Sequence, residues 1–248
     1  MNILVCISRV PDTATKVMVG SDGKTIEASG IKYVVNPYDE FAIEEGLRLR
    51  EKNGGSVTAI TVGTETSKDV LRTAYAMGVD KAALIKGTDQ FDSFYVSKNL
   101  AEYAKDKSFD LLLLGRQSVD YDSLQVPSML AEFLGMPAIS VVSKLTIDGG
   151  KAIAERDIEG GRETVEAGLP CVISAQKGLN EPRYPKLPDI MKAKSKPIEE
   201  IAAIQTDATV TILGMEIPMK QRRGKIVDGS DDNIGEIVRL LHEEAKII

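Results

Sequence analysis

Apolar residues follow two different spacings along the first 135 residues of the chain. Short unbroken apolar runs, typical of parallel strands buried on both faces, occupy residues 2–8, 56–62, 81–86 and 111–114. Between them, apolar residues spaced three or four positions apart predict helices from 36–39 to 52, from 67 to 78, from 93 to 105 and from 125 to 134. This alternation predicts an α/β fold, namely a three-layer αβα, doubly wound and mainly parallel sheet.

Four residues are expected to mark helix ends. Asn36 or Asp39 can cap the first helix, and Ser67 can cap the second, because their side-chain oxygens accept hydrogen bonds from free N–H groups. Gly78 is expected to end the second helix in the left-handed conformation, which glycine adopts at little cost.

The spacing changes after residue 138. Strand-like stretches separated by glycine pairs predict a small antiparallel ribbon over residues 141–147, 152–158 and 164–167. A short buried strand is predicted over residues 169–175. Earlier in the chain, residues 18–31 predict a hairpin that turns at residues 22–23.

After residue 194 the chain becomes polar and loses its periodicity. A basic cluster at residues 220–223 is expected to lie on a solvated arm, and residues 231–246 predict a last helix with one apolar face: Ile234, Ile237, Leu240 and Leu241. We therefore expect an α/β domain over residues 1–194 and a C-terminal arm over residues 195–248. The apolar face must pack against this domain or against a partner.

Composition excludes several classes of protein. A chain of 248 residues with 43% hydrophobic and 27% charged residues should form an ordinary globular fold. Its net charge of −6 disfavours nonspecific binding of nucleic acid, and no apolar run approaches the ~20 residues of a membrane span. The chain begins directly with a strand pattern and shows no leader, so we expect a cytoplasmic protein that is not itself a membrane protein.

Cysteine and histidine are too few for several kinds of site. Cys6 and Cys171 both lie within apolar runs, which favours buried thiols over a disulfide or a metal site. The single histidine, His242, argues against histidine-based catalytic triads and metal sites, and no metal is expected.

A candidate ligand site lies at the carboxyl ends of the predicted strands, where open parallel sheets bind ligands. These ends offer glycines and helix starts at residues 6–9, 62–64 and 115–118, and residues 36–39 follow another extended stretch. Such groups can hold a nucleotide. Neither a Gly-x-Gly-x-x-Gly sequence nor a Walker loop is present, so the same segments can equally be plain connecting turns.

The run at residues 180–188 is unusual. Pro182, Pro185 and Pro188 remove backbone donors and fix φ, so the segment is neither a helix interior nor a central strand. It carries Tyr184 and Leu187 among charged residues. A stiff loop with apolar groups is typical of protein docking. The alternative is a crossover loop that packs both side chains against its own core.

Several motifs in this region resemble the beta subunits of electron transfer flavoproteins. The matching segments are residues 156–161, 169–170, 179–184 and 187–194, and the likeness extends from Met1 to about residue 197. It implies an adenine-nucleotide-hydrolase-like sheet and a non-catalytic subunit of a heterodimer. Electrons would pass from acyl-CoA or similar dehydrogenases through FAD in the partner alpha subunit to a membrane quinone reductase.

The resemblance also implies a structural AMP in this subunit. The matching positions are Cys6, Asn36, Pro37, Tyr38, Asp39, Val62, Gly115, Arg116, Gln117, Ser118, Asp120, Asp122, Ser123, Leu124, Gln125 and Val126. Residues 124–127 read Leu-Gln-Val-Pro where the common AMP-binding form has Asn-Gln-Thr-Gly. Electron-bifurcating members hold a second FAD here and oxidise NADH. That alternative stays open, as does a stand-alone nucleotide-binding module.

Residues 175–197 match the family's recognition loop for dehydrogenases. Leu187 matches the anchoring leucine, and we expect Tyr184, Ile190 and Met191 beside it, with lysines forming a positive rim. Arg156 matches a position that faces the partner's flavin domain, and we expect Asp157 beside it to contact the partner, although many relatives have the longer Glu there. The alternative for this pair is an exposed salt bridge on a strand. The resemblance also implies that the C-terminal arm docks on the partner subunit.

Overall fold

The structure is a computed structural model that describes residues 1–88, 92–206, 209–218, 224, 226 and 230–248. The predicted basic cluster at residues 220–223 lies outside these residues. In the part of the chain that is described, no helix is long and apolar enough to cross a membrane.

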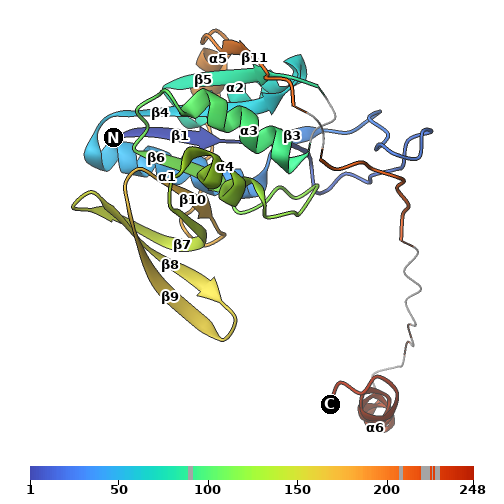
Figure 1. The fold of residues 1–248 in the computed structure, drawn as a ribbon. Helices are drawn as coiled ribbons and strands as arrows, with labels where there is room; N and C mark the ends of the chain where they lie inside the picture. The colour runs from blue at the N-terminus through green and yellow to red at the C-terminus, as the bar shows by residue number, and fades with distance from the viewer. Residues whose placement is uncertain (89–91, 207–208, 219–223, 225, 227–229) are drawn as a thin grey trace.

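A mostly parallel sheet forms the centre of the molecule (Figure 1). Over the described residues it has nine strands in the order β11-β5-β4-β1-β6-β10-β7-β8-β9. Its parallel centre consists of β1 (Asn2–Cys6), β4 (Ser56–Gly63), β5 (Lys81–Lys86), β6 (Leu111–Gly115) and β10 (Cys171–Ala175). The strand order reverses between β1 and β6, and this is the switch point of a doubly wound sheet.

Helices cover both faces of the sheet, as the three-layer prediction requires. α1 (Pro37–Asn53) and α2 (Lys68–Met77) lie on one face, and α3 (Ser93–Ala104) and α4 (Val126–Leu134) lie on the other (Figure 1). Successive residues of β1 alternate between the two cores: Ile3 and Val5 pack with α1 and α2, whereas Leu4 and Cys6 pack with α3 and α4. A strand buried on both faces therefore needs an unbroken apolar run.

The predicted helix starts are correct to within two residues, but their capping differs. Asn36 stands at the N-cap of α1 and Ser67 at the N-cap of α2, and neither side chain makes a capping bond. A short 3-10 turn, η1 (Glu65–Ser67), precedes α2 and places Ser67 in helical φ and ψ, which turns its hydroxyl away from the helix N–H groups. Gly78 follows α2 with φ of +124°, as predicted.

The antiparallel ribbon is an extension of the sheet. β7 (Ala138–Asp148) pairs in parallel with β10 at its start and antiparallel with β8 (Lys151–Ile158), which pairs with β9 (Gly161–Gly168). Val141 has φ of +62° where both pairings of β7 are irregular, and its N–H donates to Ser174 Oγ at 2.9 Å. This bulge bends β7 away from the domain, so the ribbon projects from it (Figure 1).

Several elements were not predicted. β2 (Arg9–Pro11) pairs with β3 (Tyr33–Val35), and the predicted hairpin between them is held by one bridge, from Val19 to Ile26. β11 (Glu199–Ala202) pairs with β5, so the sheet includes residues beyond the expected boundary at 194.

The remaining helices are α5 (Leu187–Ala193), α6 (Asp231–Arg239) and a π-helical turn, η2 (Leu240–Glu244). The last helix, predicted over residues 231–246, therefore consists of α6 and this π-helical turn, which ends at Glu244.

The carboxylate of Asp39 ties the switch point together. Its Oδ2 accepts the N–H of Ser8, just after β1, at 2.7 Å, and its Oδ1 accepts the N–H of Gly115, the last residue of β6, at 2.8 Å. Asp39 is therefore no cap for α1, because both oxygens are used by neighbouring strands. The residue is only 4% exposed. Burial raises the pKa of Asp39 to about 7, although the two N–H donors act in the opposite direction.

This tie predicts a characteristic pH dependence. An unfolded aspartate has a pKa of about 3.9, so a folded-state pKa near 7 makes the folded chain bind more protons between these values. The free energy of unfolding should therefore fall as the pH rises from about 4 to about 7. Asp39→Asn should be less stable than wild type, because its amide nitrogen cannot accept an N–H. Because the amide does not titrate, the variant should also lack this pH dependence of the free energy of unfolding. The stability gap between wild type and variant should shrink as the pH rises.

Urea unfolding at about pH 5 and about pH 8 measures both effects. Asp110→Asn is the matched control, because Asp110 also accepts a backbone N–H, that of Asn2 at 2.6 Å, but at an exposed position. Parallel pH profiles for wild type and Asp39→Asn would contradict the assignment.

Candidate functional site

The first group of predicted cofactor residues meets at the carboxyl ends of three neighbouring strands. Cys6 ends β1, Val62 lies near the end of β4 and Gly115 ends β6. β1 pairs with both other strands, so the three positions are adjacent. Cys6 and Val62 belong to the core beside α3 and α4. Burial, with a contribution from Asp39, raises the pKa of the Cys6 thiol, which makes it an apolar wall rather than a nucleophile.

Buried Asn36 fixes the loop that follows β6. Its Nδ2 donates to the carbonyl of Gln117 at 2.9 Å, and its Oδ1 accepts the N–H of Val119 at 3.2 Å. The side-chain polar atoms of Asn36 and Asp39 thus form hydrogen bonds with the protein backbone. The two residues fix the backbone of residues 115–119, and their own side chains are turned away from solvent.

Gly115 is required by packing against α1. A Cβ at this position would lie 2.5 Å from Asp39 Oδ1 and 2.6 Å from the Cβ of Tyr38. The absence of a side chain lets the first turn of α1 rest directly on the end of β6. The close packing of α1, rather than the expected approach of a ligand, explains the glycine at this position.

The residues left partly open at this edge are polar or aromatic. Pro37, Tyr38, Arg116, Gln117 and Ser118 are all partly exposed. The guanidinium of Arg116 lies 5.4 Å from the ring centre of Tyr38, and its Nε donates to Gln117 Oε1 at 2.7 Å. This cluster can offer a stacking surface and hydrogen-bond donors to a bound group.

The second group of predicted cofactor residues forms a loop with an uncommon backbone. Asp122 and Leu124 have φ of +53° and +56°, a region that non-glycine residues adopt at a cost of about 1–3 kcal/mol and mostly at functional loops. The loop connects β6 to α4 and passes the start of α3, where Ser123 Oγ lies 3.2 Å from Ser93 Oγ. Asp120, Leu124 and Gln125 are exposed beside Val126, the first residue of α4.

Asp92, which was not predicted, directly precedes Ser93, the residue of α3 that contacts this loop. One oxygen of Asp92 caps α3 by accepting the N–H of Tyr95 at 2.8 Å. The other accepts the N–H and the hydroxyl of Thr209, both at 2.7 Å, and the N–H of Val210 at 3.0 Å. An aspartate just before a helix is a recognisable cap signal. Its second role, anchoring the C-terminal arm, leaves no trace in the local sequence.

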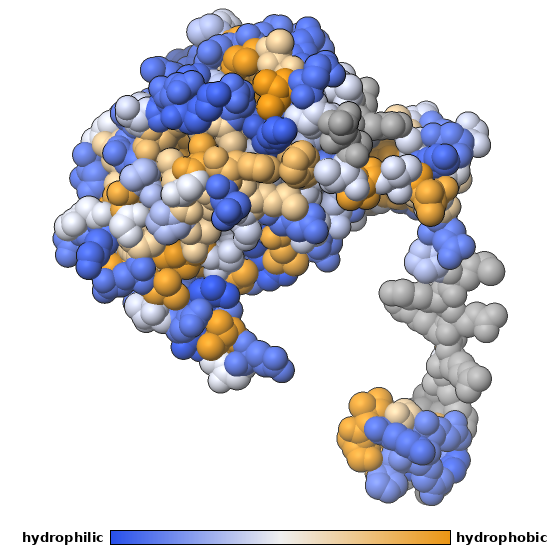
Figure 2. All heavy atoms as spheres, in the orientation of Figure 1, coloured by the Kyte–Doolittle hydropathy of each residue, from blue (hydrophilic) through white to orange (hydrophobic). Residues whose placement is uncertain are grey.

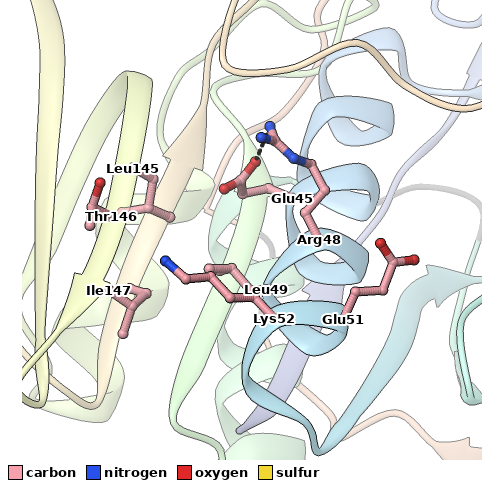
Figure 3. A pocket seen from close by; sticks show the side chains of 8 residues that line it. All are labelled: Glu45, Arg48, Leu49, Glu51, Lys52, Leu145, Thr146 and Ile147. Atoms are coloured by element: carbon pink, nitrogen blue, oxygen red, sulfur yellow. Dashed lines mark hydrogen bonds and ion pairs between the residues drawn. The ribbon is translucent and has the colours of Figure 1, made fainter.

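Two cavities lie away from the predicted cofactor residues. One of about 400 Å³ lies between α1 and β7, lined by Glu45, Arg48, Leu49, Glu51, Lys52, Leu145, Thr146 and Ile147 (Figure 3). The other, of about 430 Å³, lies between α3 and the segment around β11. The candidate cofactor site therefore rests on the converging strand ends and not on either cavity.

The predicted docking residues are displayed on the outside of the molecule. Tyr184 is 94% exposed, and Leu187 at the start of α5 is 72% exposed. Ile190 and Met191, one turn later, are also exposed. The alternative interpretation, in which Tyr184 and Leu187 pack against their own core, is therefore wrong. These four side chains form an apolar surface that a monomeric domain does not need.

Arg156 and Asp157 are paired within the ribbon. Arg156 Nε lies 3.2 Å from Glu163 Oε1, and Arg162 Nε lies 2.9 Å from Asp157 Oδ1. Both pairs join β8 to β9, at the opposite end of the sheet from α5 (Figure 1). The structure therefore does not bring these two charges together with Leu187, and their expected contact with a partner stays a prediction.

Comparison with known proteins is consistent with this architecture. The family model described as "Electron transfer flavoprotein domain" matches residues 23–206. The chain is 44% identical over 259 residues to "Electron transfer flavoprotein subunit beta" of Bacillus subtilis (strain 168), covering 100% of both chains. It is 38% identical to the protein of that name from Syntrophomonas wolfei, covering 92% of this chain and 90% of the other. The human protein of that name is 35% identical, covering 96% of each chain. The chain therefore belongs to the family of electron transfer flavoprotein beta subunits.

Proposed function

We propose that this chain is the nucleotide-binding and docking subunit of a heterodimeric electron carrier. Its alpha subunit would hold the redox FAD, take electrons from acyl-CoA or related dehydrogenases and pass them to a membrane quinone reductase. The observation that carries this proposal is the exposed apolar surface of Tyr184, Leu187, Ile190 and Met191. It occurs in a chain similar to beta subunits over its whole length.

The strand-end site is proposed to hold AMP as a structural group. Tyr38 and Arg116 are available beside a base or ribose, and Cys6 and Val62 supply an apolar wall. The first N–H groups of α4 precede its first internal bond, which Met129 donates to Gln125 at 3.0 Å. Such groups bind phosphate at a helix start.

The same helix start differs from the common AMP-binding form of the family. Pro127 supplies no N–H, and Leu124 and Val126 carry no polar atom in their side chains. Ser123, Gln125 and Ser128 are polar side chains that stay available near a phosphate at this helix start. This weaker phosphate site is the reason to keep an FAD in this subunit, and hence an electron-bifurcating enzyme that oxidises NADH, as the second candidate.

Nucleotide analysis separates these candidates. The chain would be produced together with its alpha subunit, purified as a complex and denatured, and the released nucleotides would be identified by mass spectrometry. We expect FAD and AMP in equal amounts. Two FAD per complex and no AMP would point to the bifurcating enzyme. A chain that purifies alone with an adenine nucleotide would favour a stand-alone binding module.

Leu187 is expected to anchor partner dehydrogenases. Truncation of a desolvated aliphatic anchor costs about 2 kcal/mol or more of binding, which corresponds to roughly thirtyfold in affinity. Leu187→Ala should therefore raise the concentration of an acyl-CoA dehydrogenase needed for half-maximal reduction of the carrier FAD. The yield of heterodimer and its FAD content should not change.

Stopped-flow reduction of the heterodimer by a reduced acyl-CoA dehydrogenase measures this effect. Val17→Ala is the matched control, because Val17 is also an exposed apolar residue but lies in the segment between β2 and β3. Unchanged half-saturation in Leu187→Ala would refute the docking role.

The C-terminal arm is proposed to bind the alpha subunit. Thr209 and Val210 are pinned to Asp92, and the N–H of Met215 donates to the carbonyl of Gly23 at 2.7 Å, so the arm leaves the domain along a fixed path. Beyond it, α6 shows an exposed apolar stripe away from the domain (Figures 1 and 2). The stripe consists of residues spaced three and four apart, Ile234, Ile237 and Val238.

Ile237→Asp should weaken the heterodimer, because a charge in the apolar stripe cannot be buried against a partner without loss of binding. The measurement is the fraction of alpha subunit that co-purifies with this chain, followed by size-exclusion chromatography at decreasing concentration. Glu244→Gln, an exposed position in η2, is the control. Equal dissociation of both variants would count against the arm as an interface.

A further inference from the structure

The docking helix α5 lies between two sets of hydrogen bonds, which we call the N-terminal and the C-terminal clamp. The N-terminal clamp joins the loop before α5 to α1 through Asn180 and Arg183. The C-terminal clamp joins the end of α5 to α2 through Arg72 and Tyr75. Leu187, Ile190 and Met191 lie between the two clamps and belong to neither.

The N-terminal clamp is a bidentate ion pair. Arg183 Nε lies 2.7 Å from Glu44 Oε2, and its Nη2 lies 2.9 Å from Glu44 Oε1. Its Nη1 reaches Glu51 at 2.7 Å. The hydrogen bonds with Glu44 and then Glu51 raise the pKa of Arg183 further above its usual range. Asn180 adds bonds to Glu45 and to the carbonyl of Phe41, both at 3.0 Å.

Glu44 is the buried member of this clamp. The residue is only 5% exposed, and its oxygens also accept the N–H of Arg183 at 3.1 Å. A carboxylate held by a guanidinium fork and a backbone donor has a fixed direction, and so has the loop bonded to it. Tyr184, which directly follows Arg183, therefore leaves the domain at a fixed angle.

The C-terminal clamp holds the other end of the segment. The guanidinium of Arg72 donates to the carbonyl of Ala193 at 2.7 Å and also to that of Lys196. The hydroxyl of Tyr75 donates to the carbonyl of Pro197, and Lys196 Nζ donates to the carbonyl of Val79 at 3.2 Å. Ala193, buried against α2, completes the contact. These bonds fix the last carbonyl of α5 and the backbone that follows it against α2 and the residue Val79.

We propose that Glu44 and Arg72 are positioning residues for dehydrogenase docking, which hold α5 in its binding conformation before the partner arrives. This inference rests on the docking role proposed for Leu187. Seven residues of helix with an exposed apolar face are too short to persist alone. A free segment would have to be ordered at each encounter, and that cost would be subtracted from the affinity. The clamps remove it in advance.

The test uses the complete heterodimer and a reduced acyl-CoA dehydrogenase as the probe. Glu44→Gln and Arg72→Met should each raise the half-saturating concentration of dehydrogenase by about fivefold, while the limiting rate of electron transfer stays unchanged. Hydrogen exchange of residues 180–198 in the free heterodimer should become faster in both variants. A merely structural role would change neither half-saturation nor the exchange of this segment selectively.

Matched variants keep the outcome clear. Lys144→Met removes an ion pair of the ribbon, with Glu155 at 2.5 Å, and should leave docking unchanged. Arg183→Lys keeps the charge but loses the fork, so it should give an intermediate half-saturation, and it carries the test if Glu44→Gln fails to fold.

The two proposals can fail separately. If Leu187→Ala weakens docking but the clamp variants do not, although their loop exchanges faster, pre-organisation by the clamps is refuted and docking stands. If Leu187→Ala has no effect either, docking through this surface is itself refuted and the clamp proposal falls with it.

Discussion

The buried carboxylate of Asp39 is the constraint on which the rest of the site depends. It accepts the N–H of Ser8, just after β1, and the N–H of Gly115, at the end of β6. These neighbouring strands flank the switch point, where a doubly wound sheet opens a crevice. The tie places the first turn of α1 in that crevice and requires glycine at position 115. Asn36 then orders the loop after β6 from the same helix start. A few buried polar atoms thus set the backbone of both halves of the site.

The proline-rich run at residues 180–188 contains two kinds of side chain. Asn180 and Arg183 turn inward and bind α1, whereas Tyr184 and Leu187 turn outward. The prolines stiffen the backbone between them. The first part of this run is therefore a support, and the part that follows it is an exposed surface. The polar members hold the direction in which the apolar members point.

The main sheet and its helices could be predicted because each element carries its own signal. Residues of β1 and β6 are apolar throughout, and the spacing of α2 and α3 is regular. β11 could not be predicted, because an edge strand with only Ile201 half-buried has almost no apolar pattern. The bulge at Val141 depends on Ser174, and the fork between Arg183 and Glu44 joins residues 139 positions apart. Such contacts arise only from the assembled fold. Candidate site residues were found from strand ends and resemblance, but their division into inward and outward groups was not.

Asp92 has a consequence for the order in which a complex of this kind is built. One of its oxygens caps the N-terminus of α3, beside the loop that carries Ser123. The other oxygen accepts hydrogen bonds from Thr209 and Val210 of the arm. A ligand that favours one arrangement of that loop and a subunit that favours one path of the arm would act on the same helix terminus. Thermodynamic linkage then requires reciprocity. If the ligand raises the affinity of this chain for the other subunit by some factor, the other subunit raises the affinity for the ligand by the same factor. The affinity for the cofactor and the affinity between the subunits would then depend on the same coupling free energy.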